Sequence, residues 1–95
     1  MPSTSGLPGA ELVERGLADL ARGVVSAEAL LVSISAPRLR DLGFEVDVPL
    51  VDAEHRLYLL LRDEHGNTAH ARYNALVRRL VSFERAAARR SSARA

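Results

Sequence analysis

Apolar residues recur at helical spacing along residues 68–90, the longest stretch of the chain with one consistent pattern. Successive apolar positions are separated by 4, 3, 4, 3 and 4 residues, which is the a/d spacing of a helix with one buried side. We call these positions the apolar seam; they are Ala69, Tyr73, Leu76, Leu80, Phe83 and Ala87. Val77 and Val81 lie beside the seam and widen it. The pattern predicts one long amphipathic helix whose seam must be covered by other apolar residues.

The opposite side of this predicted helix is basic. Its charged residues are Arg72, Arg78, Arg79, Arg85, Arg89 and Arg90. Glu84 is the only acid between residues 68 and 90, and at about 100° per residue the apolar and basic sectors barely overlap. Thr68 is predicted to cap the helix start by accepting a hydrogen bond from a free N–H of the first turn. Residues 91–95 are predicted to form a disordered tail.

The N-terminal residues predict an arm followed by a helix. Residues 1–7 have no apolar period and are expected to be flexible. Pro8 suits the first helical position, and apolar residues then follow helical spacing as far as Val24. Gly23 is predicted to end this helix. Gly16 lies inside it, where glycine costs about 1 kcal/mol relative to alanine, so we expect a close helix crossing there.

A second helix is predicted to begin after Ser26, whose hydroxyl can cap it. Residues 32–35 also alternate between apolar and polar, which leaves a strand possible, but the run Ala-Glu-Ala-Leu-Leu favours a helix. Pro37 disfavours helical geometry in the residue before it. The chain therefore either kinks there or begins a short helix that Gly43 closes.

Residues 44–48 alternate with a period of two, the clearest strand pattern in the chain, and Pro49 ends it. A single strand leaves its backbone N–H and C=O groups without partners. It could pair with the same strand of a second copy across a dimer axis. Alternatively, it is an extended connector that places Phe44, Val46 and Val48 on the helices.

Residues 52–64 predict a further helix, with Asp52 as its cap. Residues 57–61 are apolar without interruption, so this helix is expected to be the most buried. The short Gly66-Asn67 turn makes it a neighbour of the long helix. The predicted fold is mainly α, with four or five helices in one domain over residues 8–90.

Composition narrows the chemistry of this 95-residue chain. Cysteine is absent, which excludes disulfides, thiolate metal sites and a cysteine nucleophile. Every basic residue is arginine, which excludes lysine Schiff bases and the P-loop lysine. No segment has the pattern of a membrane span or a signal peptide, so we expect a cytoplasmic protein.

The net charge of +1 is unevenly distributed. Residues 1–66 hold six arginines and eleven acids, a net charge of −5, whereas residues 67–95 hold seven arginines and one acid, a net charge of +6. The basic helix could pair with the acidic part of the chain, or it could attract an external polyanion.

No arrangement of residues predicts catalysis, and we expect neither a cofactor nor a metal. His65 and His70 flank the Gly66-Asn67 turn, but with the nearby acids they match no metal-ligand spacing. Ser33, Ser35 and Ser82 lack the glycine-framed turn of a hydrolase nucleophile.

The first functional hypothesis is therefore a non-catalytic protein–protein interaction or regulatory module. The helix at residues 52–64 is long enough to cover only about half of the apolar seam, so a second copy or another protein is expected to cover the rest. We expect a homodimer, with an interface formed by Tyr73, Leu76, Leu80, Phe83 and Ala87.

The alternative hypothesis is a nucleic-acid-binding regulator. Its phosphate contacts would come from Arg72, Arg78, Arg79, Arg85 and Arg89. The order strand, helix, turn, helix over residues 44–90 is similar to that of ribbon-helix-helix repressors and antitoxins, which dimerise through the strand. However, the outward residues of such a strand would be Glu45 and Asp47, and their carboxylates would repel the phosphates of a DNA groove. The resemblance is therefore confined to the order of the elements.

Overall fold

The computed structural model describes residues 3–94 and contains five α-helices. The helices are α1 (Ala10–Ala21), α2 (Ala27–Ile34), α3 (Ala36–Asp41), α4 (Ala53–His65) and α5 (Ala69–Arg94). A 3-10 helix, η1 (Gly66–Thr68), joins α4 to α5. No strand occurs among the described residues, so the predicted mainly α fold is confirmed.

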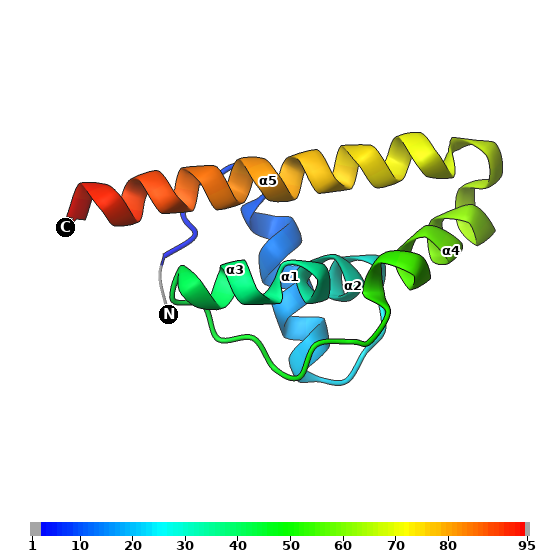
Figure 1. Cartoon of the computed structure of the whole chain (residues 1–95), viewed down its shortest axis with the longest axis horizontal. Coiled ribbons are helices and arrows are strands. Elements are labelled where there is room, and N and C mark those ends of the chain that lie inside the picture. Colours follow the sequence, from blue (N-terminus) through cyan, green and yellow to red (C-terminus); the bar gives the residue numbers. More distant parts are fainter. Residues whose placement is uncertain (1–2, 95) are drawn as a thin grey trace.

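The long helix α5 extends along the whole molecule, and the other helices lie on one side of it (Figure 1). The overall dimensions are 44 × 25 × 18 Å. Helices α2 and α3 follow one another beneath α5, while α4 diverges from α5 at the η1 turn. Helix α2 packs against α1 and α4, and α5 contacts α1, α2 and α4. The arrangement places one side of α5 on the core and leaves the opposite side free.

Helix α2 is the most buried helix, which corrects the expectation for α4. Residues 29–33 of α2 are all buried, because α1 packs on one side of this helix and α4 on the other. In α4 only Ala53, Leu57 and Leu61 are buried, while Leu59 is 46% exposed. The continuous apolar run of α4 therefore covers more than one side of the helix, although only one side meets the core.

The capping predictions have mixed outcomes. The hydroxyl of Ser26 accepts a hydrogen bond from the backbone N–H of Ala29 at 3.0 Å, which confirms its predicted role. Asp52 occupies the position before α4 in a left-handed conformation, with φ of 55°, and its side chain caps nothing. The Thr68 hydroxyl donates to the carbonyl oxygen of His65 at 3.0 Å, so the prediction that it caps α5 is wrong. The Thr68 hydroxyl is therefore hydrogen-bonded at the η1 turn, before α5 begins.

The segment at residues 44–48 is an extended connector, not a strand. The side chain of Phe44 is buried, and its ring centroid lies 5.6 Å from that of Phe83 in α5. A guanidinium N–H of Arg40 donates to the carbonyl oxygen of Val46 at 3.0 Å and holds the connector against α3. Val48, which was expected to pack on the helices, is 85% exposed. Residues 44–48 therefore pair with no other strand among the described residues of their own chain, and pairing with the same segment of a second copy stays a prediction.

The ends of the chain are more ordered than the sequence predicted. Arg90 of α5 donates to the carbonyl oxygens of Ser3 and Ser5, so residues 3–7 pack on α5 and do not form a free arm. Leu7 is buried in the core. Helix α5 continues to Arg94, through most of the segment (residues 91–95) that the sequence predicts to be a disordered tail. Extension of a helix that already exists costs little, which permits this polar last turn. Residues 1–2 and 95 lie outside the described part.

Helix α1 begins at Ala10 with Gly9 before it, later than the expected start at Pro8. It ends near Gly23, as predicted, where a φ of 72° places this glycine in the left-handed conformation typical of helix C-termini. Within the described residues, no helix has the length and apolarity that a membrane crossing requires.

Candidate functional site

The apolar seam of α5 faces the rest of its own chain. Leu80, Phe83 and Ala87 are buried, and Tyr73 and Leu76 are partly buried. From the sequence, only residues 52–64 were expected to cover the seam. The structure adds three further elements, namely α1, α2 and the 44–48 connector.

Helix α1 reaches α5 through its first residues. A Cβ atom added to Gly9 would lie 3.0 Å from the carbonyl oxygen of Arg79 and 3.7 Å from the Cβ of Phe83. The start of α1 and the ring of Phe44 therefore cover the middle of the seam, beyond the reach of α4. Leu80, Phe83 and Ala87 are therefore covered within the chain, whereas Tyr73 and Leu76 are only partly covered. Association with a second copy stays a prediction.

The arginines on the flank of α5 are engaged by their own chain. Arg79 forms an ion pair with Glu11 of α1, with 2.6 Å between guanidinium nitrogen and carboxylate oxygen. Arg90 binds the backbone of the N-terminal residues, as described above. Arg72 donates to the hydroxyl of Thr68 at 3.3 Å. These three arginines fix α5 to its neighbours, so the hypothesis of pairing with the acidic part of the chain holds for Arg79.

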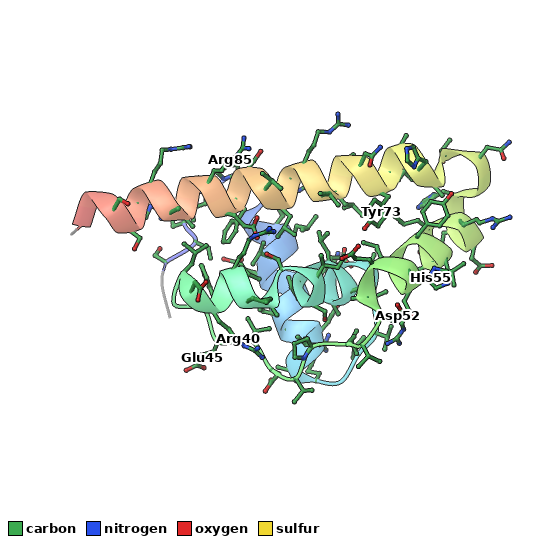
Figure 2. All side chains as sticks on the ribbon, viewed as in Figure 1. Arg40, Glu45, Asp52, His55, Tyr73 and Arg85 are labelled. Atoms are coloured by element: carbon green, nitrogen blue, oxygen red, sulfur yellow. The ribbon has the colours of Figure 1, made fainter. Side chains whose placement is uncertain are left out.

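Three other arginines project from the opposite side of α5. Arg78, Arg85 and Arg89 are separated by 7 and 4 residues, which places them on one side of a helix. We call them the outer arginine row. All three are exposed, and among the described side chains none has a hydrogen-bond or ion-pair partner. Figure 2 shows Arg85 on the side of α5 that faces away from the other helices.

The only acid of α5 is turned away from this row. Glu84 is 9% exposed, and its carboxylate accepts a hydrogen bond from the hydroxyl of Ser35, at the junction of α2 and α3. Consequently, no carboxylate lies on the outer side of α5 over residues 69–92. No acid of α5 reduces the positive potential of the outer row, although Arg85 also lines a groove with Asp41 of α3.

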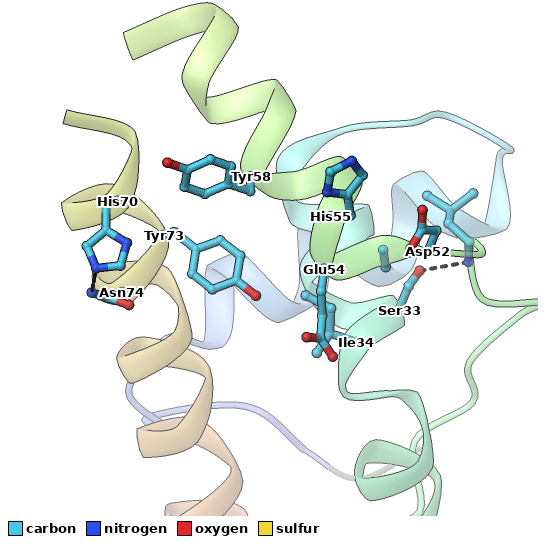
Figure 3. A pocket seen from close by; sticks show the side chains of 11 residues that line it. Ser33, Ile34, Asp52, Glu54, His55, Tyr58, His70, Tyr73 and Asn74 are labelled. Carbon is cyan, nitrogen blue, oxygen red and sulfur yellow. Dashed lines mark hydrogen bonds between the residues drawn. The ribbon is translucent and has the colours of Figure 1, made fainter. Parts of the chain in front are cut away.

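A cavity of about 790 Å³ opens where α4 and α5 diverge (Figure 3). Tyr73, predicted as an interface residue, lines this cavity together with Tyr58 of α4, and the two rings meet edge to face with centroids 6.3 Å apart. His55 and His70 also line it, from different helices. Among the described residues no group of three side chains is arranged to hold a metal ion. Sequence reasoning missed this cavity, because its residues are far apart in the sequence.

The hydroxyl of Tyr73 remains protonated at neutral pH. Burial raises the pKa of this hydroxyl above its usual value of 10.0, and the negative charge of Glu54 raises it further. The group is therefore a neutral hydrogen-bond donor at the edge of the cavity.

The two serines near the cavity have structural roles. Ser33 donates to the carbonyl oxygen of Ala29 at 2.8 Å and accepts from the backbone N–H of Leu50 at 3.0 Å. Ser35 donates to Glu84. Both hydroxyls hold neighbouring segments together.

Comparisons of the chain with protein-family models, curated proteins and solved structures gave no significant match. The function must therefore be argued from the surfaces described above.

Proposed function

We propose that this chain is a small non-catalytic module that binds nucleic acid through phosphate contacts made by the outer arginine row. The observation that carries the proposal is the placement of three exposed arginines on one side of α5, with the single acid of that helix turned inward. Contacts between arginine and phosphate do not depend on the nucleotide sequence, because they are formed by charge.

The residues between these arginines favour a polyanion over a protein partner. The other exposed residues on the outer side of α5 are small or polar, and they include Ala71, Asn74, Ala75 and Ser82. Protein interfaces usually combine arginine with aromatic or large apolar anchors that fill pockets, and the exposed residues between these arginines include no such apolar anchor. A ligand recognised here is therefore attracted by charge, as a phosphate backbone is.

The charge distribution also favours one orientation of the molecule relative to a polyanion. Residues 1–66 carry a net charge of −5 and form most of the body below α5, whereas residues 67–95 carry +6. A polyanion repels the acidic body and attracts α5. The outer row spans about 16 Å at 1.5 Å per residue, which is enough to contact several phosphates of one strand.

The homodimer expected from the sequence would need another surface. Leu80, Phe83 and Ala87 are committed to the core of their own chain. A regulatory module that pairs with a second copy through the seam would have to expose this core, which would cost much of the folding free energy.

The test is the binding of a labelled DNA duplex, followed by fluorescence anisotropy at about 50 and 200 mM salt. We expect a dissociation constant of about 10⁻⁴ to 10⁻⁶ M, typical of non-specific binding. Three phosphate contacts predict a slope of about −3 for the logarithm of affinity against the logarithm of salt concentration.

The matched variants are two double substitutions with the same change in charge. Replacing Arg78 and Arg85 by alanine should abolish binding at the lower salt concentration. Replacing Arg15 and Arg62, which lie on α1 and α4, should leave most of the affinity. Absence of binding by the unmodified chain at low salt, or an equal loss in both double variants, would exclude the proposal.

A further inference from the structure

The cavity between α4 and α5 has a charge opposite to that of the outer arginine row. Its charged lining residues are Asp52 and Glu54, both at the start of α4, and no arginine lines it. Neither carboxylate has an ion-pair partner among the described residues. The lining of the cavity is therefore negatively charged, whereas the outer side of α5 is basic.

The size and shape of the cavity suit a small molecule. Its volume of about 790 Å³ lies within the range of roughly 300–1,000 Å³ that is typical of ligand sites. Its two walls come from α4 and α5, and the end of α2 contributes Ser33 and Ile34 (Figure 3). The walls contain both apolar and polar groups, so a ligand can bury carbon atoms and place a charge.

The two tyrosine rings supply a surface that attracts cations. The planes of Tyr58 and Tyr73 meet at 65°, which directs their ring faces differently. The face of an aromatic ring carries negative electrostatic potential and binds an ammonium group within about 6 Å of its centroid. Figure 3 shows the hydroxyl end of Tyr73 directed toward the side of the cavity that holds Glu54. An aromatic face and an unpaired carboxylate are therefore available to one ligand.

Two of the other polar side chains of the cavity bond within the chain, while the carboxylates of Asp52 and Glu54 remain as acceptors. The amide of Asn74 contacts the ring nitrogen of His70 at 3.3 Å. The hydroxyl of Ser33 bonds to backbone groups on both sides. A primary ammonium group needs an acceptor for each of its three N–H donors. A trimethylammonium group has no N–H donor and needs only ring faces and a counter-charge.

We propose that this cavity binds a small organic ammonium cation, with the carboxylate of Glu54 as counter-charge and the ring of Tyr73 against its alkyl groups. The site is independent of the outer arginine row and does not rest on nucleic-acid binding. Tyr58 provides the second ring, and Asp52 adds negative charge at the mouth of the cavity.

The first test compares choline with its uncharged carbon isostere, in which a tert-butyl group replaces the trimethylammonium group. Titration of each compound into the isotopically labelled chain is followed by the backbone NMR signals of Glu54, Tyr58 and Tyr73. We expect choline to bind at least about tenfold more tightly than the isostere, because only choline carries the charge. Equal affinity of the two compounds would overturn the proposal. Butylammonium represents the primary ammonium cations: tighter binding than choline would assign the site to an ammonium group with N–H donors, and binding of neither cation would overturn the proposal.

The second test uses conservative variants. Glu54→Gln removes the counter-charge from an exposed position and should weaken choline binding at least about fivefold. Tyr73→Leu removes the ring and should weaken it by a similar factor. The matched control is Asp63→Asn, which removes an exposed carboxylate of α4 outside the cavity and should leave the affinity unchanged. The amide spectrum of each variant reports its fold, and a folded Glu54→Gln variant with full affinity would contradict the proposal.

Discussion

Gly16 of α1 lies directly against the backbone of Glu28 in α2. A Cβ atom on Gly16 would lie 2.5 Å from the carbonyl oxygen of Glu28 and 2.6 Å from Cγ1 of Val32. These distances are shorter than real Cβ contacts, so the two helices can approach this closely only because residue 16 has no side chain. The close crossing predicted from the glycine inside the helix is confirmed.

Substitution of Gly16 by alanine distinguishes this packing from intrinsic helix propensity. Propensity alone predicts that alanine stabilises the helix by about 1 kcal/mol. The crossing predicts the opposite sign, because α1 and α2 must separate to admit the methyl group, and overpacking of this kind costs about 1–3 kcal/mol. We expect Gly16→Ala to lower the free energy of unfolding, measured by urea denaturation. A more stable variant would show that the crossing is not tight.

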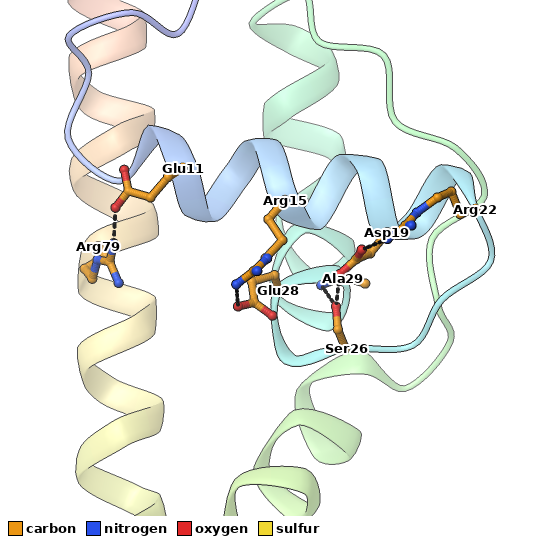
Figure 4. A network of polar contacts seen from close by, with 8 residues as sticks. All are labelled: Glu11, Arg15, Asp19, Arg22, Ser26, Glu28, Ala29 and Arg79. Atoms are coloured by element: carbon orange, nitrogen blue, oxygen red, sulfur yellow. Dashed lines mark hydrogen bonds and ion pairs between the residues drawn. The ribbon is translucent and has the colours of Figure 1, made fainter.

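Polar contacts lie beside this crossing and connect the same two helices (Figure 4). Arg15 pairs with Glu28 at 3.7 Å, an exposed contact that adds little stability. At the other end of α1, the carboxylate of Asp19 accepts from the hydroxyl of Ser26 at 2.8 Å and from Arg22 at 2.6 Å. Ser26 thus caps α2 and also binds α1.

Ser26→Ala is predicted to destabilise the chain in a pH-dependent manner. The hydrogen bond from Ser26, followed by that from Arg22, lowers the pKa of Asp19 below its usual value of 3.8. A carboxylate with a lowered folded-state pKa stabilises the fold at neutral pH, and this contribution is lost as the pH falls below about 3.8 toward the folded-state pKa. The loss of the cap itself costs about 1 kcal/mol at any pH.

Urea denaturation at neutral and acidic pH measures both contributions. The difference in stability between the unmodified chain and Ser26→Ala should be larger at neutral pH than at about pH 3. Ser82→Ala, which replaces an exposed serine of α5, is the control and should change stability little at either pH. A difference that stays constant with pH would indicate that Asp19 does not contribute.

The sequence predicted the helices because their apolar period is regular. It also predicted the close crossing at Gly16 and the cap at Ser26, because each of these roles has a local physical reason. It did not predict which residues cover the seam of α5. That cover comes from Phe44 and the start of α1, which lie far from α5 in the sequence. The outer arginine row was contained within the predicted set. The structure was needed to separate it from the flanking arginines, because their partners, such as Glu11, are distant in sequence.

The cavity was harder still to predict from the sequence, because it also depends on residues that are distant in the sequence. Tyr73 was predicted from the sequence as part of an apolar seam, whereas no sequence pattern singled out Glu54. Only the angle between α4 and α5 brings them to one space, and no local pattern encodes that angle. The spacing of apolar residues therefore assigned Tyr73 to the seam, whereas in the structure its side chain lines a cavity.

The solution mass tests whether the seam serves folding or association. Leu80 is 4% exposed within its own chain, whereas Leu59 of α4 is 46% exposed. We expect Leu80→Asp to abolish folding, because it buries an unpaired charge, and Leu59→Asp to leave the chain folded. Circular dichroism measures the fold of each variant, and sedimentation measures its mass against the monomer mass of 10.3 kDa.

The two variants give different results for the two roles of the seam. If the seam serves folding, the unmodified chain needs no second copy, and Leu80→Asp loses helical structure at every concentration. If the seam serves association, Leu80→Asp gives a folded monomer where the unmodified chain is a dimer. That outcome would contradict the burial of Leu80 in a single chain. A dimer that Leu59→Asp disrupts without unfolding would instead place the contact between copies on α4.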